Sequence, residues 1–314
     1  MAKKGQKFRK FTNEEREEIV SKYLSGKYSY EQVAKEYQIC WKSVESMVRK
    51  YKNTGTTRAL PKGQPKEKGL TKEDYKERYE ILKKYIEEAN NIVVFSGAGM
   101  STESGIKDFR SKDGLYNEKY KYPPEEILSH SFFINNTYEF YKFYKDKLNC
   151  LDSKPNFGHE FLYKLERDGK LKAIITQNID NLHTLAGNEK VIELHGNINR
   201  NYCMSCHKFY DADMVFNSKD IPKCDCGGII KPDVVLYEEA LDDNNIINAI
   251  KAIKNADLLI IAGTSLSVYP ASGFINYFNG KHLVIINNSS TFMDKKADLL
   301  INEKIGDVFK KIDQ

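Results

Sequence analysis

The first fifty residues alternate polar and apolar positions with the period of a helix. After the capping sequence Phe11-Thr12-Asn13, apolar side chains follow at helical spacing, and two shorter helices are predicted over residues 29–37 and 41–52. Their apolar positions, among them Val33, Val44 and Val48, would form a small core. Five polar residues would then face outward on the third helix: Lys42, Ser43, Glu45, Ser46 and Arg49.

This periodicity stops after residue 54. Residues 56–72 combine glycine and proline with lysine and arginine, and they are predicted to form a basic linker. Beyond it, an amphipathic helix at 73–90 leads into the apolar run Ile92-Val93-Val94-Phe95, and strands then alternate with helices. We therefore predict an all-helical module at 1–55 and a larger domain at 73–314.

Short apolar runs at 173–176, 257–262 and 283–286 each end in small or polar residues. Such runs are typical of parallel strands covered on both faces, so the larger domain is predicted to be α/β with a Rossmann-like parallel sheet. No apolar run approaches the roughly 20 residues that span a bilayer, and the N-terminus leads into polar sequence. A soluble, cytoplasmic protein is expected.

Charge separates the two parts of the chain. Residues 1–72 contain 18 Lys and Arg against 8 Asp and Glu, a net charge of +10, whereas the remainder has 31 against 36, a net charge of −5. Different partners are implied for the two parts.

A glycine-rich loop follows the first strand of the larger domain. Gly97-Ala98-Gly99 stands between a strand and a turn, where backbone amides can approach a pyrophosphate. Thr102 replaces the third glycine of the usual dinucleotide fingerprint, so a simple tight turn is the alternative. Two later strands end in Gly263-Thr264-Ser265 and in Asn287, which could bind phosphate and a ribose hydroxyl. Because ligands bind beyond the carboxyl ends of parallel strands, the three strand ends predict one crevice.

Four of the six cysteines fall in two tight pairs. Cys203 and Cys206 form one pair, Cys224 and Cys226 the other, and 17 residues lie between the pairs. Four thiolates at such spacing can close a tetrahedral zinc site without an open position for water, so one structural zinc ion is predicted in a small module at about 199–232. Unrelated reduced thiols are the alternative, and His207 is a substitute ligand.

Polar residues gather between the strand at 173–176 and the cysteine pairs. Gln177-Asn178-Ile179-Asp180 follows the strand, and Glu193-Leu194-His195-Gly196 comes just before the cysteines. An isolated histidine is more often structural than catalytic. Two polar clusters at one cofactor crevice, however, favour an active site with His195, Asn178 and Asp180 as its catalytic residues.

With these motifs the larger domain resembles a sirtuin. The resemblance follows the same order along residues 73–314 and is carried by Gly97-Ala98-Gly99-Met100-Ser101, Gly105-Ile106-Lys107-Asp108-Phe109-Arg110-Ser111, Gln177-Asn178-Ile179-Asp180, Leu194-His195-Gly196, the cysteine pairs, Lys231-Pro232-Asp233-Val234-Val235 and Gly263-Thr264-Ser265-Leu266. Sirtuins remove acyl groups from lysine and consume NAD, so the resemblance implies this activity.

The resemblance also implies a role for each matched residue. His195 would be the general base on a ribose hydroxyl as the acyl oxygen attacks C1′ and nicotinamide leaves, a task that suits a pKa near neutrality. Asn178 and Asp180 would orient the ribose and, with Ile179, bind nicotinamide. The other residues of the NAD site would be Gly97, Ala98, Gly99, Thr102, Asp108, Phe109, Arg110, Gln177, Gly263, Thr264, Ser265, Asn287 and Ile305. Of these, Phe109 and Arg110 would lie on a mobile loop.

A substrate site is implied as well. Val234, Val235 and Tyr237 match the segment where an extended substrate peptide adds as a strand. Lys107, Tyr237 and Glu238 depart from the family pattern, which usually has proline at the first position and often has phenylalanine and glycine at the other two.

Two further positions bear on the acyl group. Sirtuins that prefer succinyl-type groups carry a Tyr-x-x-Arg pair, and here Tyr144 stands in place of the arginine after Tyr141. Neutral acyl groups, either acetyl or a longer chain, are therefore expected.

The N-terminal module resembles the helix-turn-helix domain of transposase-type DNA-binding proteins. The match consists of Val33-Ala34-x-x-Tyr37-x-Ile39, a turn with Gln38 rather than glycine, and Val44-x-x-x-Val48. It implies that the third helix enters a major groove of double-stranded DNA while the basic linker contacts phosphates. The DNA-contacting residues would be Trp41, Lys42, Ser43, Ser46 and Arg49. A solvated three-helix cap is the alternative, and RNA or an acidic protein could bind the same charge.

Together the two resemblances predict an NAD-dependent lysine deacylase fused to a DNA-binding module. This pairing suggests a transcription regulator, associated with the nucleoid, that responds to NAD or to its own product. Two other functions stay open: an NAD glycohydrolase or ADP-ribosyltransferase that needs no acyl acceptor, and a non-catalytic repressor that senses NAD or ADP-ribose. The expected partners are an acyl-lysine protein or peptide and DNA, with no membrane. A palindromic DNA site would require a homo-oligomer, for which the sequence identifies no surface.

Overall fold

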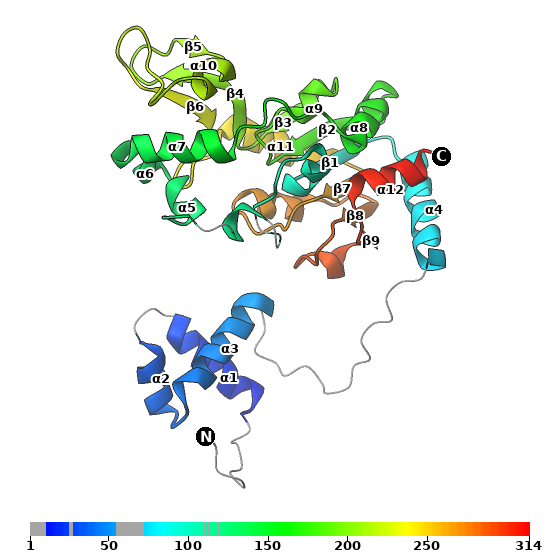
Figure 1. Cartoon of the computed structure of the whole chain (residues 1–314). Helices are drawn as coiled ribbons and strands as arrows, with labels where there is room; N and C mark the ends of the chain where they lie inside the picture. Colours follow the sequence, from blue (N-terminus) through cyan, green and yellow to red (C-terminus); the bar gives the residue numbers. More distant parts are fainter. Residues whose placement is uncertain (1–10, 25–27, 55–71, 110, 112–113, 118–119) are drawn as a thin grey trace. The chain divides into compact units, whose positions relative to one another are not determined.

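A computed structural model describes residues 11–24, 28–54, 72–109, 111, 114–117 and 120–314. The chain divides into two compact units, Met1–Gly69 and Leu70–Gln314 (Figure 1). Within the described residues, no helix is long and apolar enough to cross a membrane.

Three helices form the first unit: α1 (Asn13–Leu24), α2 (Tyr30–Glu36) and α3 (Trp41–Thr54). Reciprocal caps begin the first two, because Thr12 exchanges side-chain and backbone hydrogen bonds with Glu15, and Ser29 does the same with Gln32. The helices bury a core of Ile19, Val20, Val33, Ala34, Val44 and Val48. The predicted helices and the predicted small core are therefore confirmed.

The second unit is built on a six-stranded parallel sheet. Its strand order is β3 (Val191–Glu193), β2 (Leu171–Thr176), β1 (Ile92–Ser96), β7 (Leu258–Ala262), β8 (His282–Ile286) and β9 (Leu299–Ile301). The apolar runs predicted as strands correspond to β1, β2, β7 and β8. The strand order reverses between β1 and β7, and ligands of open α/β sheets bind at such a switch point.

Helices cover both faces of this sheet (Figure 1). Ile92 and Val94 of β1 pack toward α4 (Lys72–Glu88), α8 (Phe157–Arg167) and α12 (Ile305–Ile312). Val93 and Phe95 pack on the opposite face, toward α11 (Asp243–Asn255) and the 3-10 helix η4 (Ala271–Tyr277). Because successive side chains of a strand point to opposite faces, burial of both faces requires the continuous apolar runs seen in the sequence.

A second, antiparallel sheet stands at the end of this unit opposite α4 and α12 (Figure 1). Its order is β5 (Phe209–Tyr210), β4 (Gly196–Cys203) and β6 (Ile230–Val234). It shares an aromatic core with α5 (Pro124–Ile127), α6 (His130–Asn135), α7 (Thr137–Lys147) and α10 (Ala212–Phe216). Since β4 begins directly after His195, this sheet continues from the polar segment that the sequence singled out.

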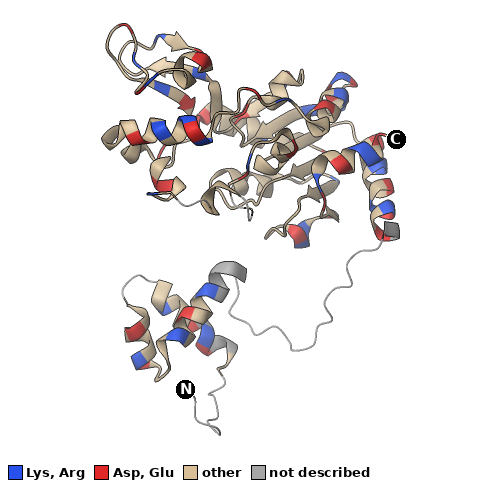
Figure 2. Cartoon of the chain, in the orientation of Figure 1, with Lys and Arg blue, Asp and Glu red and all other residues tan. Residues whose placement is uncertain are grey.

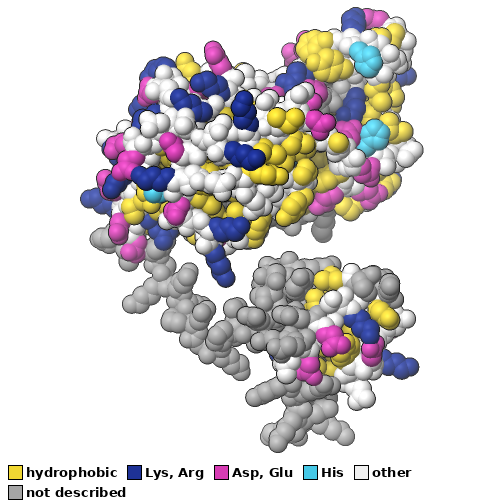
Figure 3. Space-filling model, turned by 180° about the vertical axis from the view of Figure 1, so that it is seen from behind, with side chains coloured by type: hydrophobic (Ala, Val, Ile, Leu, Met, Phe, Trp, Pro, Cys, Tyr) yellow, Lys and Arg dark blue, Asp and Glu magenta, His cyan; other side chains and the backbone are white. Residues whose placement is uncertain are grey.

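The remaining short elements mostly follow strands of the large sheet. The 3-10 turns η1 (Ala98–Met100), η2 (Thr102–Ser104) and η3 (Leu115–Asn117) lie after β1, α9 (Leu182–Leu185) lies after β2, and η5 (Asp294–Lys296) precedes β9. Tyr202 of β4, Phe209 of β5 and Met204, which follows β4, are exposed. Figure 3 shows hydrophobic side chains on the surface of the second unit.

Charged residues of both signs are distributed over both units (Figure 2). Residues 11–54 contain 8 Lys and Arg against 7 Asp and Glu, so the three helices are close to neutral. The positive excess of the N-terminal part falls on residues 1–10 and 55–72 instead. Nearly all of those residues, and with them most of the predicted linker, lie outside the described residues.

Candidate active site

A pocket of about 660 Å³ opens at the carboxyl ends of β1, β2, β7 and β8, a size suited to a small-molecule ligand. It brings together eighteen of the residues predicted for the NAD, catalytic and peptide sites. These residues are Gly97, Ala98, Gly99, Thr102, Asp108, Phe109, Gln177, Asn178, Ile179, Asp180, His195, Val234, Val235, Tyr237, Gly263, Thr264, Ser265 and Asn287. Ile305 is buried at the start of α12 and does not line the pocket, and Arg110 lies outside the described residues.

The glycine loop after β1 packs directly on the end of β7. A Cβ atom on Gly97 would lie 2.6 Å from Thr264 Cβ, and one on Gly99 would lie 2.7 Å from Gly263 Cα, so neither position has room for a side chain. The Gly97 amide donates to Ala262 O at 3.0 Å, and the Gly99 amide donates to Gly263 O at 2.8 Å. These two amides therefore join the two loops. Their glycines are needed for that contact, and the approach to pyrophosphate expected from the sequence stays a prediction.

Thr264 and Asn287 are held in place at the next two strand ends. The Thr264 hydroxyl accepts hydrogen bonds from Gln177 Nε2 and from the Leu266 amide, both at 3.1 Å, which leaves its own proton to donate into the pocket. Asn287 is buried, and its Nδ2 donates to Ser289 O at 2.7 Å. Both side chains thus have fixed orientations at the pocket.

A buried polar group lies behind the glycine loop. Ser101 Oγ donates to Asp180 Oδ2 at 2.6 Å and accepts from Asn178 Nδ2 at 3.0 Å, and Asn178 Nδ2 also lies 3.1 Å from Gly97 O. The Leu182 amide donates to the other carboxylate oxygen of Asp180 at 3.0 Å. Burial raises the pKa of Asp180, while the hydrogen bonds from Ser101 and Leu182 oppose the rise. Sequence reasoning gave Ser101 no role, although it ends the glycine motif.

His195 lies between this polar group and the small sheet. Its Nδ1 is 2.8 Å from Gln177 O, and because a carbonyl oxygen can only accept, Nδ1 must carry a proton. The neutral ring therefore keeps a lone pair on Nε2. Burial lowers the pKa of His195, and the bond to Gln177 opposes that shift, so the neutral ring prevails at pH 7.

The predicted peptide segment continues from β6 past His195. The Val235 amide donates to His195 O at 3.0 Å, which fixes this segment to the histidine. At Tyr237 the amide donates to Leu128 O and the carbonyl accepts from the His130 amide, each at 2.9 Å. The backbone of Tyr237 is therefore already paired, and its side chain is what it presents to the pocket, where its hydroxyl contacts that of Tyr116.

Glu238 stands where the family often has glycine, and its backbone conformation is one that favours glycine. Its φ of 77° lies in the left-handed region that favours glycine. Its carboxylate accepts hydrogen bonds from the amide of Ser131 at 2.8 Å and from the hydroxyl of Ser131 at 2.6 Å. These bonds to the start of α6 help to offset the strain that a side chain brings at this position.

Tyr141 and Tyr144 do not line the pocket. Both are fully buried on α7 in the aromatic core beside the small sheet, where the Tyr141 hydroxyl donates to Ile230 O. Burial raises the pKa of Tyr144 well above its ordinary value. Neither tyrosine is therefore placed to contact an acyl group in this conformation.

The four paired cysteines meet at one point. Their sulfur atoms all lie within 4.8 Å of one another, with Cys203 Sγ 3.5 Å from Cys226 Sγ and Cys206 Sγ 3.5 Å from Cys224 Sγ. Four thiolates at this separation fit a tetrahedral zinc ion with Zn–S bonds of about 2.3 Å. His207 is not part of the cluster found among the described residues. The prediction of four cysteine ligands therefore agrees with the geometry.

Comparison with known proteins identifies the family. The model of the Sir2 family matches residues 97–270. An NAD-dependent protein deacetylase of Clostridium perfringens (strain 13 / Type A) is 61% identical over 235 residues, which cover 74% of this chain and 96% of that protein. The chain belongs to the Sir2 family. A relative of the same name in Staphylococcus aureus (strain N315) is 44% identical over 236 residues, covering 74% of this sirtuin and 97% of the relative.

Solved structures agree with this assignment. A structure of Sir2 with a p53 peptide and NAD+ has a TM-score of 0.66 and 39% identity, and the match covers 74% of this sirtuin and 95% of that chain. A structure of Sir2Tm bound to a propionylated peptide has a TM-score of 0.66 and 38% identity, with the same coverage. The predicted Rossmann-like fold and the predicted class of enzyme, an NAD-dependent protein deacylase, are thus confirmed. About a quarter of the chain lies outside these matches, and the family match does not extend to the N-terminal unit.

Proposed function

We propose that this sirtuin removes neutral acyl groups from lysine side chains with His195 as the general base, and that its N-terminal unit binds double-stranded DNA. The observation that carries the first part is the position of His195. It lies in the pocket at the switch point of the sheet. Its side chain donates to Gln177 O in the polar segment after β2, and its backbone carbonyl accepts from the Val235 amide in the peptide segment after β6.

The tautomer of His195 suits a proton acceptor. Gln177 O holds the proton on Nδ1 at 2.8 Å, so Nε2 is free to accept a proton from a ribose hydroxyl. The lowered pKa of His195 keeps this nitrogen unprotonated at neutral pH. Asp180 and Asn178, fixed through Ser101, would orient the ribose and the nicotinamide amide.

The pocket residues fit NAD. Thr264 has a hydroxyl proton to donate to phosphate, and Asn287 lies at the end of β8, where a ribose hydroxyl would lie. Bound NAD would supply the electrophilic C1′ carbon and the nicotinamide leaving group. The zinc ion, held by four thiolates with no open position, would stabilise the small sheet and take no part in the reaction.

The peptide segment supports a deacylase over an NAD glycohydrolase or ADP-ribosyltransferase. Val234 and Val235 line the pocket at the end of β6, and an edge of this kind can pair with an extended peptide. The proposal of neutral acyl groups rests on the sequence alone, because Tyr144 stands in place of the arginine expected for acidic ones but does not line the pocket.

A single assay tests the enzyme proposal. The full chain is incubated with NAD and an acetyl-lysine peptide while peptide mass, O-acetyl-ADP-ribose and free nicotinamide are followed. We expect all three to change together, and we expect His195→Ala to reduce the rate by about 100-fold or more. Nicotinamide release that does not depend on the peptide would favour the glycohydrolase. Full activity of His195→Ala would exclude the assigned base, and a succinyl-lysine peptide should react far more slowly than the acetyl-lysine peptide.

Support for the DNA proposal comes from α2 and α3. The two helices are joined by a short turn in which Gln38 has a φ of 54°, a conformation that lets the chain reverse sharply between them. Trp41, Lys42, Ser46 and Arg49 are exposed on α3, while Ser43 is half-buried, and Lys42 Nζ lies 5.6 Å from the centre of the Trp41 ring. These side chains form an outward face on a helix that could enter a major groove.

The pairing of the two units suggests a transcription regulator that responds to NAD or to its product. Binding of the full chain to a duplex containing its own promoter should be measured by fluorescence anisotropy, with and without NAD. We expect binding that weakens as salt increases. Absence of binding at low salt would leave the three helices as a solvated cap. A change in affinity on adding NAD, without any peptide turnover, would favour the non-catalytic sensor.

A further inference from the structure

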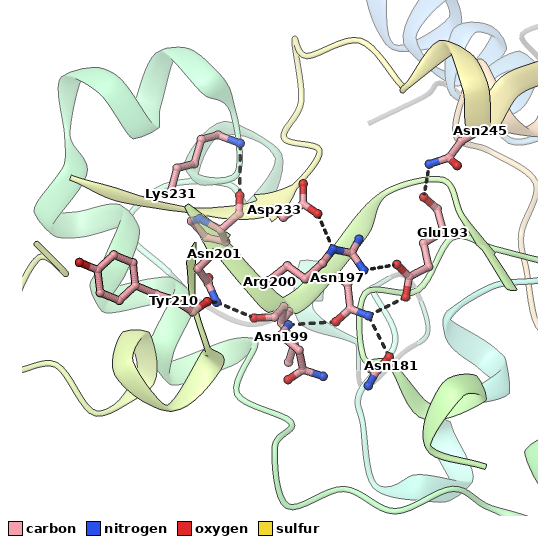
Figure 4. Close-up of polar contacts among 12 residues, drawn as sticks. Asn181, Glu193, Asn197, Asn199, Arg200, Asn201, Tyr210, Lys231, Asp233 and Asn245 are labelled. Atoms are coloured by element: carbon pink, nitrogen blue, oxygen red, sulfur yellow. Dashed lines mark hydrogen bonds and ion pairs between the residues drawn. The ribbon is translucent and has the colours of Figure 1, made fainter. Parts of the chain in front are cut away.

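An ion-pair network connects residues that adjoin the active-site segments in the sequence (Figure 4). Arg200, in the middle of β4, reaches carboxylates on two other strands. Its Nη1 is 2.7 Å from Glu193 Oε2 at the end of β3, and its Nε is 2.7 Å from Asp233 Oδ2 on β6. Arg200 thus joins the large parallel sheet to the small zinc-bearing sheet.

Both acids that Arg200 contacts flank active-site segments. Glu193 comes two residues before His195, and Asp233 immediately precedes Val234 and Val235 of the peptide segment. None of Glu193, Arg200 and Asp233 is among the residues that line the pocket. The network can therefore influence the reaction through the segments that it holds, and the charge of Glu193 adds to the effect of burial in raising the pKa of Asp180.

The carboxylate of Glu193 also connects the network, through Asn197, to Asn181 on the side of the pocket where nicotinamide is proposed to bind. Asn197 Nδ2 lies 2.5 Å from Glu193 Oε1 and 2.9 Å from Asn181 Oδ1, and Asn181 directly follows Asp180 (Figure 4). Asn181 has a φ of 65°, a left-handed conformation that a hydrogen bond to its side chain helps to hold. On the other side, Asn245 Nδ2 donates to Glu193 O at 3.0 Å.

Backbone contacts at the same place leave little room for adjustment. Gly196 has a φ of 79°, and a Cβ atom there would lie 1.9 Å from Asp233 O, so β4 and β6 touch through their backbones beside His195. The Val235 amide bonds to His195 O at 3.0 Å. A shift of β6 would therefore also move His195, unless the side chains of Glu193, Arg200 and Asp233 hold β6 in place.

We propose that Arg200 is a positioning residue for deacylation, which fixes the peptide segment relative to His195 by bridging Glu193 and Asp233. This inference rests on the proposed roles of His195 and of Val234 and Val235. The planar guanidinium suits the task because its N–H groups leave in fixed directions and can serve two carboxylates at once, which a lysine ammonium on a flexible stem cannot do with the same geometry.

The contribution to global stability should be small. The side chains of Arg200 and Asp233 are 39% and 43% exposed, and an ion pair so open to solvent adds little to the free energy of unfolding. Glu193 is only 15% exposed, but its carboxylate still accepts a hydrogen bond from Asn197 when Arg200 is replaced. If Arg200 served only to stabilise the fold, replacing it would therefore leave both the free energy of unfolding and the kinetic constants nearly unchanged. A positioning role changes the kinetics for the peptide and leaves stability unchanged.

The test compares Arg200→Met with the full-length wild type in steady-state deacetylation of an acetyl-lysine peptide. We expect KM for the peptide to rise by about 10-fold, since small displacements of a binding segment have effects of this order or larger. KM for NAD, the zinc content and the melting temperature should stay close to those of the wild type. Arg200→Lys, which keeps the charge without the two-point geometry, should recover less than half of the change in log KM.

Lys208→Met serves as the matched control. It removes a lysine whose Nζ lies 2.6 Å from Asp225 Oδ2 on the same zinc-bearing module, away from the active-site segments. A peptide KM for Arg200→Met within twofold of the wild type would overturn the proposal, as would an equal rise in Lys208→Met. If Arg200→Met loses zinc or fails to fold, Asp233→Asn and Glu193→Gln provide the test, and each should raise the peptide KM. A wild type without deacetylase activity would contradict the proposed function itself, whereas an active wild type with an unaffected Arg200→Met would contradict this inference alone.

Discussion

In the catalytic unit the polar groups assigned to chemistry are buried or half-buried and hydrogen-bonded to the structure around them, whereas in the N-terminal unit most of the groups assigned to DNA are exposed on a single helix. Asp180 and Ser101 are 8% and 1% exposed and share a hydrogen bond of 2.6 Å. Trp41, at the start of α3, is 42% exposed. The side chains of a buried polar network keep their positions only if the surrounding fold is intact. Side chains on an exposed helix face keep theirs as long as the helix itself forms.

The difference has a practical consequence for experiments. Perturbations of buried groups should change activity together with local structure, and perturbations of the exposed face should change binding alone. Trp41 is the only tryptophan in the chain, so tryptophan fluorescence reports on the N-terminal unit and not on the catalytic one. The two units can therefore be followed separately in the full-length protein.

Zinc removal should have the largest effect. Chelation, or Cys203→Ser, takes away a ligand of a four-sulfur site whose binding energy stabilises the small sheet. Because β4 of that sheet starts at Gly196, directly after His195, we expect deacetylase activity to be lost almost completely. Activity and zinc content are measured together, and the melting transition seen by Trp41 fluorescence should stay unchanged.

Cys40→Ser provides the control for the zinc experiment, since Cys40 is exposed and outside the cluster. This variant should keep both zinc and activity. A zinc-free protein with full activity would show that the small sheet does not depend on the ion, and a shift in the Trp41 transition would show that the two units depend on each other.

Asp180→Asn should have the next largest effect. Removing the charge while keeping the shape should lower kcat/KM by about 100-fold, because the ribose-orienting group is altered within a buried network. The pH dependence of stability should change as well. Burial raises the pKa of Asp180, so ionisation in the folded state costs free energy at every pH above that raised pKa.

The melting temperatures of Asp180→Asn and the wild type should therefore be compared at several values of pH. The variant should gain stability relative to the wild type as pH rises from the ordinary pKa of 3.8 through the raised pKa, and the gain should then stay constant. A difference in melting temperature that stays flat or moves in favour of the wild type as pH rises over this range would contradict the assigned direction of the pKa shift.

Elements with local signals were predictable from the sequence, and contacts between distant segments were not. The strands β1, β2, β7 and β8 read as apolar runs because both faces of the sheet are covered. The glycine motif was found, but its close contact with the loop after β7 was not. Gly97 and Gly99 are required by the approach of Gly263, which lies far along the chain, and single-sequence reasoning does not show that contact.

At two further positions the residue type did not reveal the backbone conformation. Gln38 and Glu238 stand where glycine was expected, and both adopt a positive φ, of 54° and 77°. The backbone thus keeps the conformation that glycine favours, and hydrogen bonds from Ser131 help to hold it at Glu238. Ser101 and Arg200 were not singled out because their partners come from other strands and loops.

Substitutions on the exposed face of α3 should have smaller effects than substitutions of the buried groups. Replacing Arg49 or Lys42 with Gln removes one positive charge from that face, so DNA affinity should fall a few-fold and the slope of log affinity against log salt should decrease by about 1 for each lost phosphate contact. Deacetylation of a peptide should be unaffected. Affinity is measured by fluorescence anisotropy over a range of salt concentrations.

Lys35→Gln is the matched control for α3, because Lys35 is exposed on α2 and removes the same charge. A similar loss of affinity in Lys35→Gln would indicate binding through overall charge. If none of the three variants changes the DNA affinity, binding would depend on the basic residues 1–10 and 55–72. If the full chain does not bind DNA at all, the DNA proposal would be wrong.

The smallest effect is expected at Glu238, on the free energy of unfolding. Glu238→Gly relieves a positive φ, which destabilises a residue with a side chain by about 1 kcal/mol, but it also loses the two hydrogen bonds from Ser131. The two changes should nearly cancel. Glu238→Ala loses the bonds and keeps the strain, so it should be the less stable variant by about 1 kcal/mol in urea denaturation. Equal stabilities of the two variants would mean that the backbone at 238 is not strained, and that the family's glycine is not needed for its conformation.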